Sequence, residues 1–196
     1  MRVLGIDPGS QSTGYGCVDS DGRRHQLVLC GAIRAGAEER FPDRLAAIHR
    51  ELTRVIRDCT PECVAIENLF HATNVRSALL LGHARGVAML AAVQAGLPVV
   101  EYTPAEIKRA VVGYGRAEKV QVQRMMKLLL GLDRMPSPHD AADALAVAVC
   151  HLHSGFGAIT AASRSRSARG GVPQPGRSAS VKSWRDYKPA RPRLRA

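Results

Sequence analysis

The sequence predicts an α/β fold in which a mixed five-stranded sheet is flanked by helices. Short apolar runs end on turns or acids, polar turns separate the first three of these runs, and helical periodicity appears between the later ones. The expected order is three strands, helix, strand, helix, strand and two or three further helices. The first three strands then form an antiparallel meander, and the other two add in parallel.

The first three predicted strands are joined by tight connections. Residues 3–6 are apolar and stop at Asp7-Pro8-Gly9, which is a turn sequence. Residues 13–19 and 26–33 follow, and a polar turn at 20–24 separates them. The first strand is therefore expected to be buried and to deliver Asp7 at its carboxyl end.

Helices and strands alternate in the middle of the chain. Leu45 to Ile56 show helical spacing after Pro42-Asp43, which is a helix start. Residues 63–67 form a short strand that ends on Glu67, and residues 74–95 form a long helix rich in Leu and Ala. Residues 99–102 form the fifth strand.

Three helices are expected to complete the fold. Thr103 as N-cap, Pro104 and Glu106 make a capping box for the first. Residues 122–129 give an amphipathic second helix. The last starts at 137–140, with Ser137 as its N-cap, and runs to about residue 153.

The charge of the chain is unevenly distributed. Of the net +11, residues 163–196 carry +9, from ten basic residues and one acid, whereas residues 1–162 carry only +2. Residues after about 158 are also rich in Ser, Gly and Pro, and they lack the apolar surface that offsets chain entropy. We therefore expect a folded domain over 1–158 and a flexible basic tail over 159–196. The charge favours a nucleic acid over a membrane as partner, although an inert solvated terminus is the alternative for the tail.

The sequence also favours a cytoplasmic protein. Charged, His or Gly residues interrupt each apolar run before it reaches the roughly 18–20 residues of a membrane span. The N-terminus meets Asp7 too early for a signal peptide. The five cysteines are odd in number and lack zinc-binding spacing, which indicates reduced thiols.

Four carboxylates are the candidates for chemistry. Asp7 and Glu67 end two strands whose carboxyl ends are neighbours if both strands are central. Asp140 and Asp143 lie three apart at the start of an apolar helix, so they share one face. Buried acids need a partner, and acidic oxygens suit Mg²⁺ or Mn²⁺. Two such ions would activate water and stabilise the leaving oxygen of a phosphodiester, which predicts a nuclease.

Each acid also has a simpler interpretation. Asp7 is a turn residue before Pro-Gly, Glu67 an exposed strand end, and Asp140 an N3 acid that interacts with the helix dipole. Asp143 is harder to explain in this way because its helix is so apolar. The combination of all four favours the metal site.

Four segments, in order over residues 1–153, resemble a RuvC-type Holliday junction resolvase. They are Val3-Leu4-Gly5-Ile6-Asp7-Pro8-Gly9-Ser10 with Thr13-Gly14-Tyr15-Gly16, Ala65-Ile66-Glu67-Asn68-Leu69-Phe70, Val111-Val112-Gly113 with Ala117-Glu118-Lys119-Val120-Gln121-Val122, and Asp140-Ala141-Ala142-Asp143-Ala144-Leu145-Ala146. The resemblance implies a ribonuclease H-like fold, a homodimer, and symmetric Mg²⁺-dependent nicking of two opposed strands at a four-way DNA junction during recombination and repair. Asp7, Glu67, Asp140 and Asp143 match the family's metal-binding carboxylates. Some members have His at the position of Asp140, and His139 lies one place earlier.

Further positions follow from the resemblance and from their chemistry. Lys119 and Lys108 match lysines near the scissile phosphate, where a positive charge stabilises the reacting group; both are solvated helix lysines in the simpler interpretation. Phe70 is a candidate wedge for the base stack, or else a loop anchor. Arg76 is a candidate phosphate contact, or else a surface residue.

Two other functions compete with an endonuclease. Asp7-Pro8-Gly9-Ser10 can be interpreted as the phosphate loop of an actin-like ATPase, but 196 residues are too few for two large lobes. A non-catalytic junction-binding protein using the tail is the second, and four unmetallated acids on a DNA-binding surface argue against it. A RuvA–RuvB branch-migration complex is a candidate partner.

Overall fold

The computed structural model describes residues 1–34, 40–68 and 74–154. In these ranges the five strands are β1 (Arg2–Asp7), β2 (Ser12–Ser20), β3 (His25–Arg34), β4 (Cys63–Glu67) and β5 (Val99–Tyr102). The five helices are α1 (Phe41–Cys59), α2 (Val75–Gln94), α3 (Pro104–Val112), α4 (Lys119–Leu129) and α5 (His139–His153). The predicted order of elements is confirmed, and most boundaries agree with the prediction to within one or two residues.

The sheet has the order β3-β2-β1-β4-β5. β1–β2 and β2–β3 pair antiparallel, whereas β1–β4 and β4–β5 pair parallel. The predicted mixed sheet is therefore confirmed. Strands β1 and β4 are central and adjacent, so their carboxyl ends lie at the same edge of the sheet.

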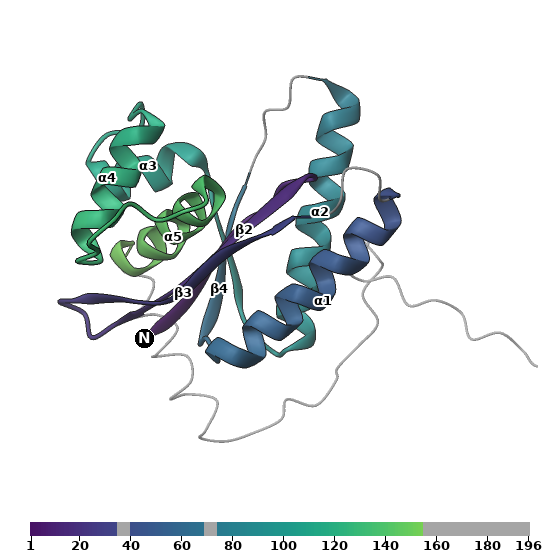
Figure 1. Ribbon diagram of the computed structural model, residues 1–196, viewed down its shortest axis with the longest axis horizontal. Coiled ribbons are helices and arrows are strands. Elements are labelled where there is room, and N and C mark those ends of the chain that lie inside the picture. Colours follow the sequence, from purple (N-terminus) through teal and green to yellow (C-terminus); the bar gives the residue numbers. More distant parts are fainter. Residues whose placement is uncertain (35–39, 69–73, 155–196) are drawn as a thin grey trace, which may run out of the picture.

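Helices cover both faces of the sheet (Figure 1): α1 and α2 lie on one side, and α3, α4 and α5 on the other. Alternate residues of each central strand enter the two cores, as a period of two requires. Leu4 and Ile6 of β1 pack with α1 and α2, whereas Val3 packs on the α5 side. Burial on both faces explains why these strands are continuous apolar runs.

Helix α5 packs directly on the backbone of β1 and β2, and glycines permit this approach. A Cβ at Gly5 would lie 2.0 Å from the Ala144 carbonyl oxygen, and one at Gly14 would lie 2.0 Å from the Asp140 carbonyl oxygen. Neither neighbour is a side chain that can move aside. The two glycines therefore set the depth at which α5, and the acids at its start, sit against the sheet.

The N-termini of α3 and α5 are capped differently. Thr103 forms the predicted capping box with Glu106 at the start of α3. For α5 the prediction was wrong: the N-cap is Pro138 rather than Ser137, and no side-chain hydrogen bond caps this end in the described ranges. Asp140 is consequently the second residue of α5, and its carboxylate bonds to another element, as described below.

The expectation that no apolar run is long enough for a membrane also needs correction. Helix α2 has the length and composition of a membrane span, with a mean hydropathy of 1.2, because Leu, Ala and Val outweigh the residues that interrupt the run. Only 22% of that window is buried. A single helix of this kind is common in proteins that never enter a membrane, so it carries no membrane argument. It does show that α2 has an exposed apolar face.

Candidate active site

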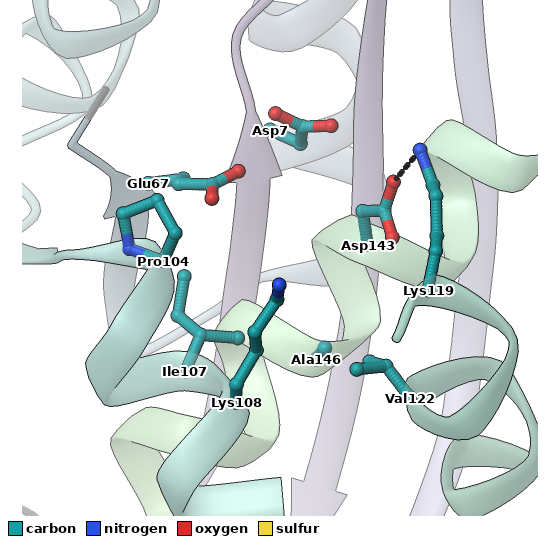
Figure 2. A pocket seen from close by; sticks show the side chains of 9 residues that line it. All are labelled: Asp7, Glu67, Pro104, Ile107, Lys108, Lys119, Val122, Asp143 and Ala146. Carbon is teal, nitrogen blue, oxygen red and sulfur yellow. Dashed lines mark ion pairs between the residues drawn. The ribbon is translucent and has the colours of Figure 1, made fainter. Parts of the chain in front are cut away.

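The predicted strand-end acids lie side by side. In the parallel pairing of β1 with β4, Ile6 is opposite Ile66, so the next residues, Asp7 and Glu67, leave the sheet together. Figure 2 shows both carboxylates pointing into one cavity. The two central strands thus bring acids that are 60 residues apart in the sequence to a single edge.

Helix α5 brings the other two acids to the same place. Oxygen atoms of Asp7, Asp140 and Asp143 lie within 4.8 Å of one another. Glu67 lines the same cavity as Asp7 and Asp143. The structure therefore gathers all four predicted carboxylates from three separate elements.

The cavity has a volume of about 390 Å³ and two chemically different sides. Acids occupy one side, together with Lys108 and Lys119, whose side chains point toward them (Figure 2). The other side is apolar and comes from α3, α4 and α5, through Pro104, Ile107, Val122 and Ala146. This wall reduces the hydration of the acids and strengthens the electrostatic interactions among them.

Crowding of the acids changes their protonation. Burial, followed by the charge of Glu67, raises the pKa of Asp7 to about 8. Burial also raises the pKa of Glu67, and repulsion from Asp143 adds to this effect. The two strand-end acids therefore ionise less readily than free carboxyl groups unless a cation balances their charge.

Lys119 supplies one such cation. Its Nζ lies 2.7 Å from Oδ2 of Asp143, and this hydrogen bond raises the pKa of the lysine. Lys119 is the first residue of α4, and 60% of its side chain remains exposed. The ammonium group can therefore move away when another cation reaches Asp143.

Sequence reasoning missed two contacts that orient the start of α5. The hydroxyl of Ser12 donates to Oδ2 of Asp140 at 2.6 Å, and Nε2 of Gln123 lies 2.6 Å from Nδ1 of His139. Each contact joins residues far apart in the sequence, so local patterns do not indicate it. The spacing along the two helices is nevertheless consistent with their contacts. Lys119 and Gln123 are four residues apart on α4, and their partners Asp143 and His139 are four residues apart on α5.

The remaining predicted site residues differ in where they lie relative to the cavity. Lys108 lines the cavity that the acids also line. Arg76 is exposed in the first turn of α2 and is not among the residues that line the cavity. Phe70 lies outside the described residues. His139 is exposed, its Nδ1 is bonded to Gln123, and it does not belong to the converging acidic group.

The donor set fits a hard divalent cation. The converging ligand atoms are all carboxylate oxygens, which Mg²⁺ and Mn²⁺ prefer, and the group includes neither a thiolate nor an imidazole. The raised pKa of Asp7 points in the same direction, because a cation would replace the proton that the crowded acids otherwise need.

A mixed sheet of this order with carboxylates at the ends of its central strands defines a ribonuclease H-like nuclease. A family model for "Crossover junction endodeoxyribonuclease RuvC" matches residues 3–151. A protein of that name from Koribacter versatilis is 55% identical over 155 residues, covering 79% of this chain and 93% of the relative. The chain belongs to the RuvC family of crossover junction endodeoxyribonucleases.

Solved structures agree with this assignment. The Thermus thermophilus RuvC structure has a TM-score of 0.74 and 34% identity, and it covers 81% of this chain and 96% of the other. T. thermophilus RuvC in complex with a Holliday junction substrate has a TM-score of 0.73 and 32% identity, with the same coverage. Neither the actin-like ATPase nor the non-catalytic binding protein is favoured by these similarities.

The raised pKa of Asp7 predicts how stability depends on pH without metal. Asp7 is neutral in the folded state up to about pH 8, but it ionises near pH 4 in the unfolded chain. The metal-free protein therefore loses stability as pH rises through this window. Asp7→Asn removes the ionisation, so its melting temperature should exceed that of wild type increasingly toward pH 8, by ~2–4 °C per kcal/mol of relieved repulsion.

Thermal unfolding in the presence of a chelator, at the two ends of this window, measures the effect. Asp133→Asn, at an exposed position outside the cavity, controls for the loss of a surface charge. A constant difference in melting temperature across the window would contradict the shifted ionisation of Asp7.

Proposed function

We propose that this chain is a structure-specific DNA endonuclease that resolves four-way (Holliday) junctions by hydrolysing two opposed phosphodiester bonds symmetrically. The observation that carries the proposal is the convergence of Asp7, Asp140 and Asp143 within 4.8 Å, beside Glu67 and two lysines. Membership of the RuvC family supports it, as does the fold shared with T. thermophilus RuvC, which was solved with a junction substrate.

In this proposal Asp7, Glu67, Asp140 and Asp143 hold two Mg²⁺ ions, with Mn²⁺ as a substitute. Bound cations of this kind supply a nucleophilic water and stabilise the leaving oxygen of an in-line displacement. The rigid strand ends fix Asp7 and Glu67, and α5 fixes the other two acids. The acids therefore need little reorganisation to bind cations, because the sheet and α5 already hold them in place.

Lys119 and Lys108 act on the phosphate. Lys119 stays on Asp143 in the metal-free protein and is free to contact a phosphate oxygen once a cation takes its place. Lys108 lines the cavity from α3 and Lys119 lines it from α4, so the two ammonium groups approach the cavity from different helices. Both stabilise negative charge that develops on the phosphoryl group.

Phe70 and Arg76 complete the proposed DNA interface. Phe70 follows Glu67 by three residues and is proposed to enter the base stack at the crossing, where a branched substrate makes unstacking less costly. Arg76 is exposed near the start of α2, two residues after the N-cap Asn74, and is proposed to contact a backbone phosphate.

Symmetric cutting requires two active sites, and α2 offers a surface for a homodimer. Its inner side packs in the core through Ala84 and Ala88. Its outer side forms an apolar groove with α1, lined by Leu45, Ala78, Leu79, Gly82, His83, Gly86, Val87 and Leu90. A Cβ at Gly82 or Gly86 would meet no atom within 4 Å, so a second helix could approach the backbone closely here.

The tail is proposed to act separately from the chemistry. A nearly neutral domain over 1–158 holds the acids, and the basic segment over 159–196 adds affinity through phosphate contacts. The protein is proposed to act in the cytoplasm on junction DNA, with a RuvA–RuvB branch-migration complex as a candidate partner.

Cleavage of a synthetic mobile four-way junction with Mg²⁺ tests the reaction. Wild type should produce paired nicks in opposed strands, and Asp143→Asn should cut at least ~100-fold more slowly, because losing ~3 kcal/mol of charge stabilisation corresponds to that factor. Junction binding should persist, since the variant carries one less charge that repels phosphate. Asp133→Asn is the control. Absence of paired nicks in wild type, or full activity of Asp143→Asn, would refute the proposal, and binding without any cutting would favour the non-catalytic alternative.

Leu79→Arg tests the dimer surface. Leu79 is 58% exposed, so the charged side chain should leave the core intact but place a desolvated charge in the helix interface and dissociate the dimer. Leu128→Arg, at a 71% exposed position on α4, is the matched control. Sedimentation should report a folded monomer only for Leu79→Arg. A dimeric Leu79→Arg, or dissociation of both variants, would place the interface elsewhere.

Deletion of residues 163–196 tests the tail. Because these residues carry +9, the truncated protein should bind the junction more weakly and show a shallower dependence of log affinity on log salt concentration. The cleavage rate at saturating enzyme should stay close to that of the full chain. Affinity measured over a series of salt concentrations is the readout, and an unchanged slope would exclude a DNA contact by the tail.

A further inference from the structure

Within the acidic cluster, the Asp140 carboxylate accepts a hydrogen bond from a residue of another element. Ser12 is the first residue of β2, and its hydroxyl donates to Oδ2 of Asp140 at 2.6 Å, across 128 residues of sequence. We propose that Ser12 is a positioning residue for the metal site, because its hydroxyl holds the Asp140 carboxylate so that the other oxygen remains available to a cation. This inference rests on the proposed role of Asp140 as a metal ligand.

Asp140 needs such a partner because of its place in α5. As the second residue of the helix, it lies beside the first-turn N–H groups, which lack intrahelical partners and attract carboxylates. The N-cap, Pro138, offers these groups no side-chain hydrogen bond within the described ranges. An unrestrained Asp140 side chain would therefore turn toward its own helix end. The bond from Ser12 directs it across to β2 and Asp7 instead.

The backbone around Ser12 fixes the position from which its hydroxyl donates to Asp140. Gly14 lies on the same face of β2, two residues further on, and the absence of a Cβ there lets the backbone at Asp140 approach the strand. The Thr13 hydroxyl donates to the Gly9 carbonyl at 2.9 Å, and Ser12 itself pairs with Arg34 of β3. The donor is therefore held by the sheet and by the turn that follows Asp7.

Ser12 and Lys119 interact with their carboxylates in different ways. The ammonium of Lys119 neutralises Asp143 and competes with a cation for it. The hydroxyl of Ser12 carries no charge and occupies one carboxylate oxygen, so it can remain bonded when a cation binds the other. Partners that orient a metal ligand in this way typically contribute ~10–100-fold to metal affinity.

The matched variants are Ser12→Thr and Ser12→Val, which have the same shape and differ in the hydroxyl. Both β-branched side chains suit a strand position. Calorimetric titration of metal-free full-length protein with Mn²⁺ should give an affinity within about threefold of wild type for the Thr variant and at least ~10-fold weaker for the Val variant. Ser20→Ala removes a hydroxyl at the far end of β2, where its partners are Gly22 and His25, and should leave the affinity unchanged.

Cleavage supplies a second readout. The Mg²⁺ concentration for half-maximal junction cutting should rise for Ser12→Val by the same factor as the Mn²⁺ dissociation constant, while the rate at saturating Mg²⁺ stays near that of wild type. A merely structural role would lower the saturated rate and the melting temperature of the metal-free protein instead. That pattern, or equal Mn²⁺ affinities for the Thr and Val variants, would overturn the role of Ser12.

Asp140→Asn separates this inference from the proposed function. If Asp140→Asn weakens Mn²⁺ binding and Ser12→Val does not, the role of Ser12 fails while the metal site stands. If Asp140→Asn binds Mn²⁺ like wild type, Asp140 is not a ligand, and the proposed metal set fails together with the inference. Weakened binding in both variants, with the Thr variant preserved, supports both.

Discussion

The close contact of α5 with the backbone of β1 and β2 is the constraint on which the site depends. Gly5 and Gly14 leave space that a Cβ would take from the carbonyl oxygens of Ala144 and Asp140. Helix packing at this depth brings Asp140 and Asp143 to the strand end that carries Asp7. With ordinary side chains at the glycines, α5 would stand further from the sheet and the acids would no longer converge. The same contact that builds the core therefore gathers the acids.

This packing creates an electrostatic problem that the protein meets in three ways. Asp7 retains a proton, because its pKa is raised to about 8. Asp143 forms an ion pair with the Lys119 ammonium, and Asp140 accepts a hydrogen bond from the Ser12 hydroxyl. The first two partners are charges that a divalent cation can replace, whereas the third is neutral and can stay. The groups that stabilise the metal-free site therefore differ in how readily a metal ion displaces them from the carboxylates. Such a site is held in shape before the cation arrives, which reduces the cost of binding.

Much of this arrangement could be predicted from the sequence because the signals are local. Apolar runs and helical spacing predicted the strands and helices, and the topology of parallel strands predicted that Asp7 and Glu67 would be neighbours. Contacts between distant segments could not be predicted in this way. The bond from Ser12 to Asp140 and the pairing of Gln123 with His139 depend on how β2, α4 and α5 pack. The N-cap of α5 was misassigned because Ser137 has the preferred residue type, but the helix begins after Pro138.

The distribution of charge has a physical consequence for the order of events on DNA. The net +11 suggests a broadly basic surface, yet residues 1–162 carry only +2, and the site contains four acids. Phosphate would be repelled from such a site until cations bind, so electrostatic attraction has to come from elsewhere. Residues 163–196 carry +9 in a segment with little apolar surface. In the proposed function, this separation lets long-range attraction act through residues 163–196, while hydrolysis requires cations at the strand ends. Salt should therefore weaken DNA association more than it weakens the chemical step, because cations bound at the acidic site are shielded from bulk screening.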